Sequence, residues 1–310
     1  MSAARSAGLL LGFAADRWLG DPRRLHPVAG FGTVAGAYER AIYADSRARG
    51  VLYTTTLVGG AIALGALAER TSASALGRVA LTALATWAVI GGRSLEREAE
   101  AVHAHLDSAD LAAARQRLTH LVGRDTADLD ESQVARAVIE SVAENTSDAV
   151  VAALFWGALA GIPGLLGYRA ANTLDAMVGH HNARYEHFGW ASARLDDLVN
   201  LPGSRLAGLL TVALGGEPRS ASRAWRRDAR RHPSPNAGVV ESAFAGSLGI
   251  RLGGTNTYYG ARTEERAVMG DGRPPASDDI PRSARLAQRV GWGSALVLAA
   301  AGAGLAGVRS

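Results

Sequence analysis

The sequence contains no cysteine and no lysine. The absence of cysteine excludes disulfide bonds and thiolate metal sites, although it does not decide the cellular compartment. All 33 basic residues are arginine, and charged residues make up only 20% of the 310-residue chain. Internal repeats and low-complexity tails are also missing. One arginine precedes the first short apolar run and acidic residues follow it, which is not the pattern of a cleaved signal peptide.

Hydrophobic residues are abundant, at 48% of the chain, and they are bunched. A helix that crosses a bilayer needs about 17–25 predominantly apolar residues. Four runs come close to that length, and two shorter runs fit half-spans or buried helices. The longer runs are 51–68, 76–92, 149–167 and 291–308, and the shorter runs are 6–15 and 206–216.

These runs favour a membrane protein over a soluble, alanine-rich protein with buried helices. The run 291–308 contains no charge. The runs are rich in glycine and alanine, which permit close helix packing in lipid, and tryptophans fall at their edges, as in an interfacial belt. Strand signals are scarce. We therefore predict an all-α, polytopic integral membrane protein with interfacial helices, forming one domain over 1–310 with a larger polar segment at 217–290.

The path of the third long run bears on topology. A complete crossing by 149–167 would carry the following polar block, 168–200, to the outside. The Gly-Pro break at 161–164 instead indicates a broken or re-entrant segment that returns this block to the cytoplasmic side. The number of crossings therefore stays open. Three arginine-rich blocks are predicted to be cytoplasmic, namely 17–49, 93–136 and 219–231.

A charged stripe leads into the third long run. Arg136, Glu140, Glu144 and Asp148 are spaced by four residues, so they form one slanted stripe on a helix. Charges at a membrane edge are costly unless water, metal or a cation compensates them. Arg136 can pair with Glu140, which leaves Glu144 and Asp148 beside Asn145. Hard oxygen atoms clustered in this way suit Mg²⁺ bound together with phosphate, and an ordinary solvated helix face is the alternative.

The polar block 168–203 is dense in amide, acidic and histidine side chains. Helical spacing places its acids and amides in two groups, with histidines and aromatic residues between them. No HExxH-type spacing occurs, so a zinc site has little support. The density of these residues favours an oxygen-rich Mg²⁺–phosphate and substrate site over isolated caps. The residues are Asn172, Asp175, His180, Asn182, Asp196, Asp197 and Asn200.

Five arginines fall within residues 223–231. The planar guanidinium binds phosphate and carboxylate. Arginines beside a membrane also set topology and contact anionic lipid, and both interpretations stay open. The HPSPN turn that follows can orient His232 and Asn236. Residues 252–260, LGGTNTYYG, are a weaker candidate for a nest of backbone N–H groups that binds an anion, and no Walker loop occurs.

Four stretches, in this order, closely resemble the CobD/CbiB family of adenosylcobinamide-phosphate synthases: GDPRRLHPV, ESVAENTSDAVVAALFW, RAANTLDAMVGHHNARYEHFGWASARLDDLVNLPGSRL and RRHPSPNAGVVESAFAGSLGIRLGG. The resemblance runs from about residue 9 to residue 305. It implies a multi-pass enzyme of cobalamin biosynthesis in the inner membrane, with its active site facing the cytoplasm. The implied reaction is an ATP- and Mg²⁺-dependent amide ligation of adenosylcobyric acid with (R)-1-aminopropan-2-ol or its O-phosphate.

For that reaction, we assign expected roles to the residues already singled out. The expected catalytic residues are Glu140, Glu144, Asp148, His180 and Asp196, with either His180 or Asp196 as the base. The expected ligands of Mg²⁺ are Glu144, Asp148 and Asp175. The expected substrate-binding residues are Asn145, Asn172, Asn182, Asp197, Asn200, Arg227, Arg230, Arg231, His232 and Asn236.

The expected partners are the corrinoid, aminopropanol or its phosphate, and membrane lipid, with no nucleic acid. The sequence leaves open the oligomeric state, an association with other cobalamin-pathway enzymes, the preferred form of the amine, and whether a histidine contacts cobalt.

Two other classes of protein fit the polar residues. An intramembrane Mg²⁺-dependent prenyl- or alcohol-phosphotransferase also places Asp and Asn on facing helices, and NTLD with DDLVN superficially fits it. Dependence on a lipid diphosphate would distinguish this class. A transporter also uses polar residues within the membrane, but the acids here lie in segments that look interfacial, and two-fold internal similarity is missing. A corrinoid-binding membrane protein without catalysis is a further alternative.

Overall fold

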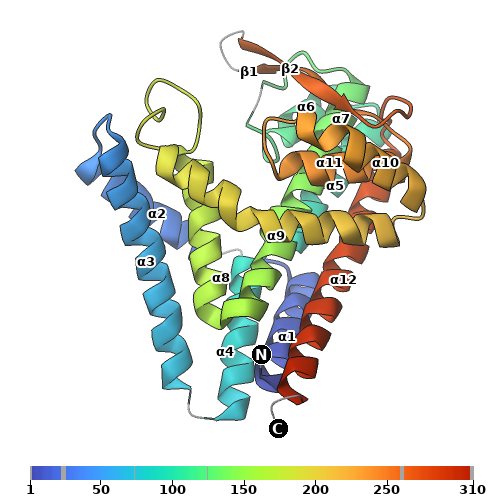
Figure 1. Cartoon of the computed structure of the whole chain (residues 1–310). Coiled ribbons are helices and arrows are strands. Elements are labelled where there is room, and N and C mark those ends of the chain that lie inside the picture. The colour runs from blue at the N-terminus through green and yellow to red at the C-terminus, as the bar shows by residue number, and fades with distance from the viewer. Residues whose placement is uncertain (1, 22–25, 73, 124, 259–261, 308–310) are drawn as a thin grey trace. The chain divides into compact units, whose positions relative to one another are not determined.

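The computed structural model describes residues 2–21, 26–72, 74–123, 125–258 and 262–307, and their side chains except at 255–265 and 303–307. Its chain divides into two compact units, each assembled from separate stretches. Helices dominate both units (Figure 1). The first unit comprises Met1–Gly91, Asp148–Gly203 and Ser294–Ser310, and the second comprises Gly92–Ser147 and Ser204–Gly293.

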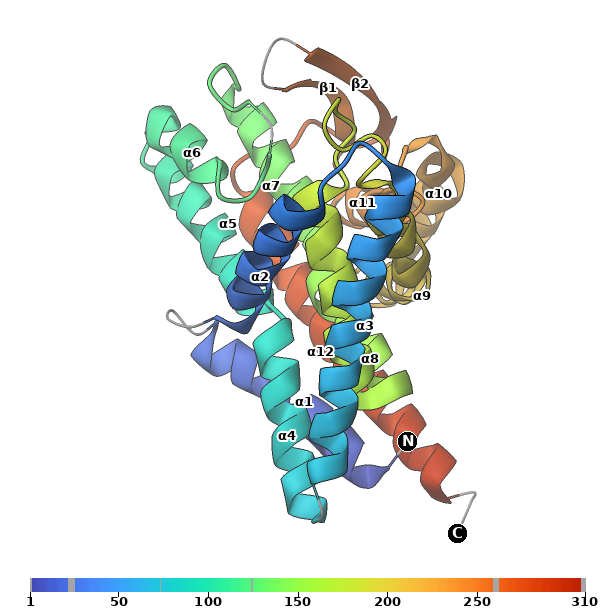
Figure 2. The same cartoon turned by 90° about the vertical axis from the view of Figure 1, so that its left-hand side faces the viewer.

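The first unit is a bundle of long helices. Helices α3 and α4 form a helical hairpin, in which Ser72 caps the end of α3 and Ser74 caps the start of α4. Helix α1 packs along α4, and α3 packs along α8, as Figures 1 and 2 show. The helices are α1 (Ala3–Leu19), α2 (Pro27–Ile42), α3 (Arg47–Thr71), α4 (Ala75–Val89) and α8 (Ala152–Val178).

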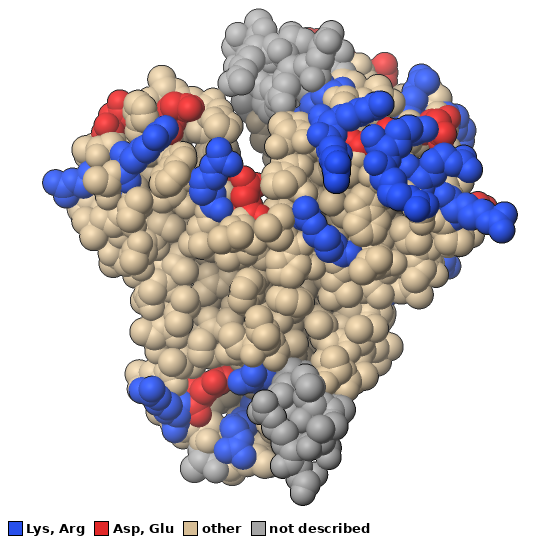
Figure 3. All heavy atoms as spheres, viewed as in Figure 1, with Lys and Arg blue, Asp and Glu red and all other residues tan. Residues whose placement is uncertain are grey.

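Three helical stretches among the described residues are long and apolar enough to cross a membrane. They are Arg47–Thr71, Ala75–Asp107 and Glu131–Val178, and they contain the predicted runs 51–68, 76–92 and 149–167. Charged side chains gather near the two ends of α3, and the surface between them is uncharged (Figure 3). These observations confirm the predicted class, a helical membrane protein. The run 291–308 falls in α12 (Asp279–Gly307), and its last residue lies outside the described part.

Helix α8 reverses direction at the predicted Gly-Pro break. Gly161 leaves helical geometry, with φ 70° and ψ −148°, and Pro163 follows it. A Cβ placed on Gly164 would lie 2.2 Å from the carbonyl oxygen of Trp156. Such proximity is impossible along a straight helix, in which eight residues span about 12 Å. The two arms of α8 therefore lie side by side, which is the re-entrant path expected from the sequence.

Side chains from α1 and α3 hold this reversal. Glu69 accepts a hydrogen bond from the backbone N–H of Ile162 at 2.9 Å, and its carboxylate lies 3.6 Å from the Arg5 guanidinium. Arg5 also donates to the carbonyl oxygens of Ala158 and Leu159, at 3.4 and 3.3 Å. Non-helical backbone within a membrane is tolerated only where such partners satisfy it. The ion pair thus stabilises the turn.

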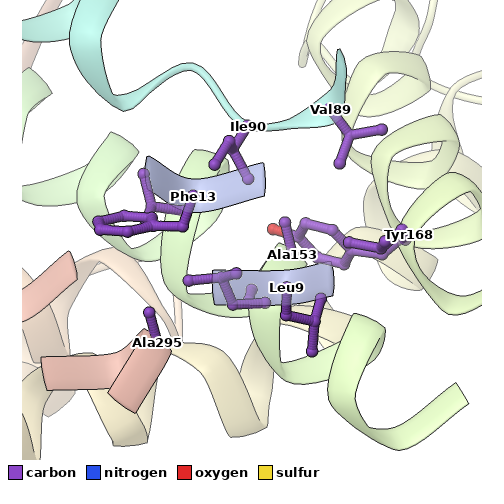
Figure 4. Packing of buried hydrophobic residues seen from close by; sticks show 11 residues of the cluster. Leu9, Phe13, Val89, Ile90, Ala153, Tyr168 and Ala295 are labelled. Atoms are coloured by element: carbon purple, nitrogen blue, oxygen red, sulfur yellow. The ribbon is translucent and has the colours of Figure 1, made fainter. Parts of the chain in front are cut away.

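A hydrophobic core joins α1, α4 and both arms of α8 (Figure 4). Leu9 and Phe13 of α1, together with Ile90, are at most 2% exposed. Burial of one such side chain contributes about 1.5–3 kcal/mol. A second cluster joins α3 to the loop after α8, where the rings of Tyr53 and Phe188 are 5.1 Å apart between centroids. These clusters fix the frame in which the polar residues lie.

The second unit contains shorter helices and a small sheet. Strands β1 (Leu252–Tyr258) and β2 (Arg262–Met269) form an antiparallel hairpin that the sequence did not predict, because Gly253, Gly254 and polar residues interrupt any apolar alternation. Helix α9 (Trp190–Leu214) contributes to both units. The other helices are α5 (Gly92–Asp107), α6 (Leu111–Leu118), α7 (Glu131–Asn145), α10 (Pro218–Asp228), η2 (Ala229–Arg231) and α11 (Ala237–Leu248).

Candidate active site

Tyr168 lies at the centre of a polar cluster in the first unit. Because α8 turns back, its second arm carries Tyr168 to the start of the first arm, where the hydroxyl lies 2.6 Å from the carbonyl oxygen of Asp148. The same hydroxyl lies 2.6 Å from Oδ1 of Asn200 on α9. Tyr168 and Asn200 are both buried. The reversal and α9 therefore bring three distant parts of the sequence to one place.

Two amide side chains hold the Asp196 carboxylate. Asn172 donates to one oxygen at 3.3 Å, and Asn200 donates to the other at 2.8 Å. Burial, followed by the charge of Asp175, raises the pKa of Asp196 to about 7, although the two amide hydrogen bonds oppose the shift. A carboxyl group that titrates near neutral pH is suited to general acid–base catalysis. The pKa of Asp196 therefore lies in the range that suits a group exchanging protons at neutral pH.

Arg169 brings positive charge to the same cluster. Its guanidinium donates to Oδ1 of Asn172 at 3.3 Å, and Asp21 and Asp148 are among its charged neighbours. Asp21 belongs to the GDPRRLHPV stretch, and its carboxylate lies 3.8 Å from Nε2 of His26. Residues from three of the sequence motifs thus meet in the first unit.

Asp175 and Asp197 extend the acidic part of the cluster. Asp175 follows Asn172 on the same helix, is half-buried, and has Asp197 and His180 among its charged neighbours. Burial raises the pKa of Asp197, while Arg194, 3.9 Å away, acts in the opposite direction. Negative charge is thereby concentrated beside Asp196.

The loop between α8 and α9 is fixed to α2. Glu39 accepts hydrogen bonds from the side chains of Arg184 and Tyr185, each at 3.0 Å. Asn182, an expected substrate-binding residue, accepts from the backbone N–H groups of these same two residues at 3.0 Å. Its side chain oxygen therefore serves a local turn. His180 is exposed at the start of the loop.

In the second unit, Glu140 supports the hairpin. Its carboxylate accepts from the backbone N–H of Gly253 at 2.8 Å and lies 3.8 Å from Arg136, which confirms the predicted ion pair. Arg136 also donates to the carbonyl oxygen of Gly253. Gly253 and Gly254 have positive φ, at 80° and 93°. The anion at this glycine-rich turn is therefore the protein's own Glu140.

Glu144 and Asn145 lie at the end of α7. Glu144 is half-buried, and Asn145 donates to the carbonyl oxygen of Ser141 at 2.9 Å. The next element, η1 (Thr146–Val151), is a π-helix that contains Asp148. Isolated π-helical turns are rare and are frequent at functional sites. The chain is therefore locally irregular at the motif that carries these acids.

His232 and Glu241 form a buried pair in the second unit. Nε2 of His232 lies 3.7 Å from the Glu241 carboxylate, and Nδ1 accepts from the backbone N–H of Ser234 at 3.0 Å. Asn236 accepts from Ser204 at 2.9 Å and from Arg205 at 2.7 Å. The HPSPN turn thus orients His232 and Asn236, as expected, but both side chains contact other protein groups.

The arginines expected to bind substrate differ in their surroundings. Arg227 donates twice to the Asp228 carboxylate, both at 2.7 Å, and once to Asp271 at 3.1 Å. Arg231 lies 3.6 Å from the same Asp228. Burial opposes ionisation of Asp228, but Arg227 and other donors hold its pKa below the usual value. All three expected arginines are exposed, and Arg227 and Arg231 are paired with carboxylates of the protein.

The donor atoms of the first unit fit Mg²⁺ that arrives with phosphate. Among the described residues, no three histidine, aspartate or glutamate side chains converge closely enough to hold a metal ion. Mg²⁺ commonly takes one or two protein carboxylates and completes its shell with phosphate oxygens and water. Asp148 and Asp175 are half-buried carboxylates, so they suit such an open site better than a closed cage.

Sequence reasoning missed several members of these sites. Tyr168 and Arg169 precede Asn172 by one helical turn, which was an available signal. Glu241 is visible in the sequence after the HPSPN turn, but its pairing with His232, nine residues away, was not predicted. Ser204 and Arg205 lie beside an internal Pro202 that made the course of α9 hard to predict.

The family described as CobD/Cbib protein matches residues 9–287. A Mycobacterium tuberculosis protein, "Cobalamin biosynthesis protein CobD", is 48% identical over 297 residues, with 94% of each chain covered. Proteins of the same name from Chromobacterium violaceum and Rhodobacter capsulatus are 46% and 39% identical, covering 92% and 94% of this chain and 93% and 96% of their own. No solved structure matches the chain. The match over most of the sequence, together with the relatives, shows that the chain belongs to the CobD/CbiB family.

Proposed function

We propose that this protein takes part in cobalamin biosynthesis in the inner membrane, with its active site on the cytoplasmic side. The proposed reaction joins adenosylcobyric acid to (R)-1-aminopropan-2-ol or its O-phosphate through an amide bond. The family and the names of its relatives support the pathway. The reaction itself is inferred from the resemblance of the motifs and from the chemistry of the polar cluster.

The observation that carries the proposal is the environment of Asp196. Amide formation requires a neutral amine, because an ammonium ion has no lone pair to attack with. Asp196 has a pKa of about 7, so at neutral pH a large fraction is available as the base. His180, the other expected base, lies exposed on a loop and has no comparable support. We therefore favour Asp196.

The proposed reaction has two steps. The propionate oxygen of the corrinoid attacks the γ-phosphorus of ATP, which gives an acyl phosphate and ADP. The amine nitrogen then attacks the acyl carbon, phosphate leaves with the carbon–oxygen bond electrons, and Asp196 takes the proton from nitrogen. Asp148 and Asp175 would hold Mg²⁺, which neutralises phosphate charge when it is bound. Glu144 stays an expected ligand on the basis of its spacing from Asp148.

Two expected roles change with the structure in hand. Glu140 is better placed as a support for the hairpin than as a catalytic group, because its carboxylate already accepts from Gly253. Arg169 is a better source of positive charge for phosphate than Arg227, because Arg227 is engaged by two aspartates. Orientation of two large reactants would supply much of the rate.

Purified protein in detergent should be incubated with adenosylcobyric acid, ATP, Mg²⁺ and each amine in turn. We expect a corrinoid whose mass equals the sum of the reactants less one water, and no such product when ATP or Mg²⁺ is omitted. Asp196→Asn should lower the rate of product formation by about 10²–10⁴-fold, whereas the same change at exposed Asp128 should not. Turnover of a lipid diphosphate without amide formation would instead indicate the phosphotransferase class.

A further inference from the structure

One face of α10 carries a row of exposed arginines. Arg219, Arg223 and Arg226 are spaced by four and three residues, so they lie along one side of the helix. All three are exposed, whereas Ala221 and Ala224 on the other side are buried. Arginine side chains gather over α10 in Figure 3. The small buried residues let α10 pack closely on α11, which leaves the cationic face outward.

This row is not neutralised within the protein. Across the described part of the chain, no carboxylate lies within ion-pair distance of Arg219, Arg223 or Arg226. The recorded side-chain bond of Arg226 is to the carbonyl oxygen of Ser222, at 3.2 Å. In contrast, the adjacent Arg227 is engaged by Asp228 and Asp271. Three like charges on one helix face repel each other unless anions from outside compensate them.

Exposed apolar side chains occur at the end of α9, just before α10 in the sequence, and in α12. Helix α9 ends five residues before Arg219, and within the same unit it exposes Leu209 at 60% and Leu214 at 37%. A Cβ on Gly293 would contact Leu214, and Trp292 beside it is 37% exposed. Exposed leucine and tryptophan next to a strongly basic helix face are typical of segments that lie in a membrane interface.

The shape of the surface distinguishes between ligands. Pro218, Ser222 and the arginines of α10 line an open hollow, and every lining residue belongs to this one helix. A small-molecule site usually encloses most of its ligand, which a single helix face cannot do. A layer of headgroup phosphates presents several anions in one plane, and a row of planar guanidinium groups matches it.

We propose that the α10 face, defined as Arg219, Arg223 and Arg226, binds the headgroup phosphates of anionic phospholipids. This interaction is separate from the ligation reaction and does not depend on it. A basic side chain near an anionic membrane surface contributes about fivefold to binding. Loss of all three arginines should therefore weaken the preference for anionic lipid by about two orders of magnitude at low salt.

The absence of cysteine allows a direct test. Ser222 lies within the arginine row, so Ser222→Cys labelled with a fluorophore gives a single probe on the α10 face. The full-length protein is placed in nanodiscs of phosphatidylcholine that contain a fraction of brominated phosphatidylglycerol. A parallel set contains the same fraction of brominated phosphatidylcholine. We expect stronger quenching by the brominated anionic lipid, and we expect salt to reduce it.

Two variants sharpen the test. In R219Q/R223Q/R226Q, the two brominated lipids should quench the fluorophore equally. R97Q/R251Q/R285Q removes the same charge from exposed arginines elsewhere in the second unit and should keep the preference. Both variants should elute from size-exclusion chromatography in detergent as the parent does and unfold at the parent's temperature, which shows that they fold. Equal quenching in the parent protein would overturn the proposal. The proposal would also be overturned if inorganic phosphate or ATP reduced quenching of the label in neutral nanodiscs, because the face would then bind small anions.

Discussion

At the scale of single residues, Asp196 is the most informative position. Its two carboxylate oxygens are held by Asn172 and Asn200, while burial and Asp175 raise its pKa to about 7. The amides fix its orientation without neutralising it. The proton affinity of the Asp196 carboxylate is therefore set by its burial and its neighbours in the fold. Substitution of Asp196 should affect both catalysis and stability.

The first prediction concerns the pH dependence of activity. If Asp196 is the base, kcat/KM should rise with pH and level off above an apparent pKa of about 7. Asp196→Asn should lower kcat by about 10²–10⁴-fold, the usual contribution of general base catalysis. Steady-state rates from pH 5.5 to 8.5 would show this, with ADP release as the readout. If the pH–rate profile of Asp196→Asn has the same slope and the same rates as that of the parent protein, Asp196 is not the base.

The second prediction concerns stability. The pKa of Asp196 is higher in the folded chain than in the unfolded chain, so its protonated form favours folding. Its contribution is fully present below about pH 4 and is lost as pH rises through about 7. Asp196→Asn mimics the protonated group and should flatten this fall. The detergent-solubilised proteins can be compared by thermal unfolding at pH 5 and pH 8. An unchanged pH dependence in the variant would contradict the raised pKa.

Glu140 gives a third prediction at this scale. Its carboxylate accepts from Gly253 and pairs with Arg136, so Glu140→Gln removes a charge-assisted bond and should cost about 1.5–3 kcal/mol of stability. Turnover below the unfolding temperature should stay within about tenfold of the parent. Denaturant unfolding and kcat would be measured together. A loss of turnover as large as that of Asp196→Asn, at unchanged stability, would restore a catalytic role.

At the scale of secondary-structure elements, the reversal of α8 organises the site. Gly161 adopts φ 70° and ψ −148°, a region that is essentially restricted to glycine. Its absent Cβ also leaves room for Glu69 and Arg5, because a Cβ there would lie 2.0 Å from the Glu69 carboxylate. The reversal therefore requires glycine for backbone geometry and for space.

The fourth prediction follows from this geometry. Gly161→Ala should destabilise the protein by about 1–3 kcal/mol from backbone strain alone. Activity should also be lost, because Tyr168 would move away from Asp148. Gly60→Ala is a matched control, because a Cβ there would meet nothing within 4 Å. On α3 it should be neutral or slightly stabilising. Thermal unfolding and ligation rate would be compared in both. Equal behaviour of the two variants would show that the reversal tolerates a side chain.

The sequence predicted this reversal but not its consequences. Gly161 and Pro163 are strong local signals, whereas the contact of Tyr168 with Asp148 depends on how far the second arm travels back. The hairpin of β1 and β2 was missed because Gly253 and Gly254 break the apolar alternation of a strand, and its hydrogen bond to Glu140 comes from 113 residues away. Local sequence patterns predict helices and the points where they break, whereas contacts between residues far apart in the sequence decide which polar groups meet.

At the scale of the whole molecule, the uncharged surface of α3 indicates where lipid lies. Leu64 is 62% exposed within α3, and Leu76 is 78% exposed at the start of α4. Exposure of a leucine side chain to lipid costs little free energy, whereas its exposure to water is unfavourable. Exposure of this kind within a long helix is therefore consistent with a chain folded for a bilayer.

The fifth prediction uses this pair. Leu64→Arg should impair membrane insertion, because a charge within a span costs about 2.5–3.5 kcal/mol towards the helix centre. Leu76→Arg lies near the end of a span, where arginine can reach the interface, and should insert normally. Carbonate extraction and yield in the membrane fraction would measure both. Normal insertion of Leu64→Arg would mean that this face of α3 is not in contact with lipid.

The side-by-side arms of α8 also restrict how the chain can change in length. Asp148 and Tyr168 meet only because the number of residues on each arm of the turn brings them level. Deletion or insertion of one residue would rotate everything beyond it by about 100° and shift it by about 1.5 Å. Apart from the glycines at the turn, residues 149–167 can thus exchange among apolar types while their number stays fixed.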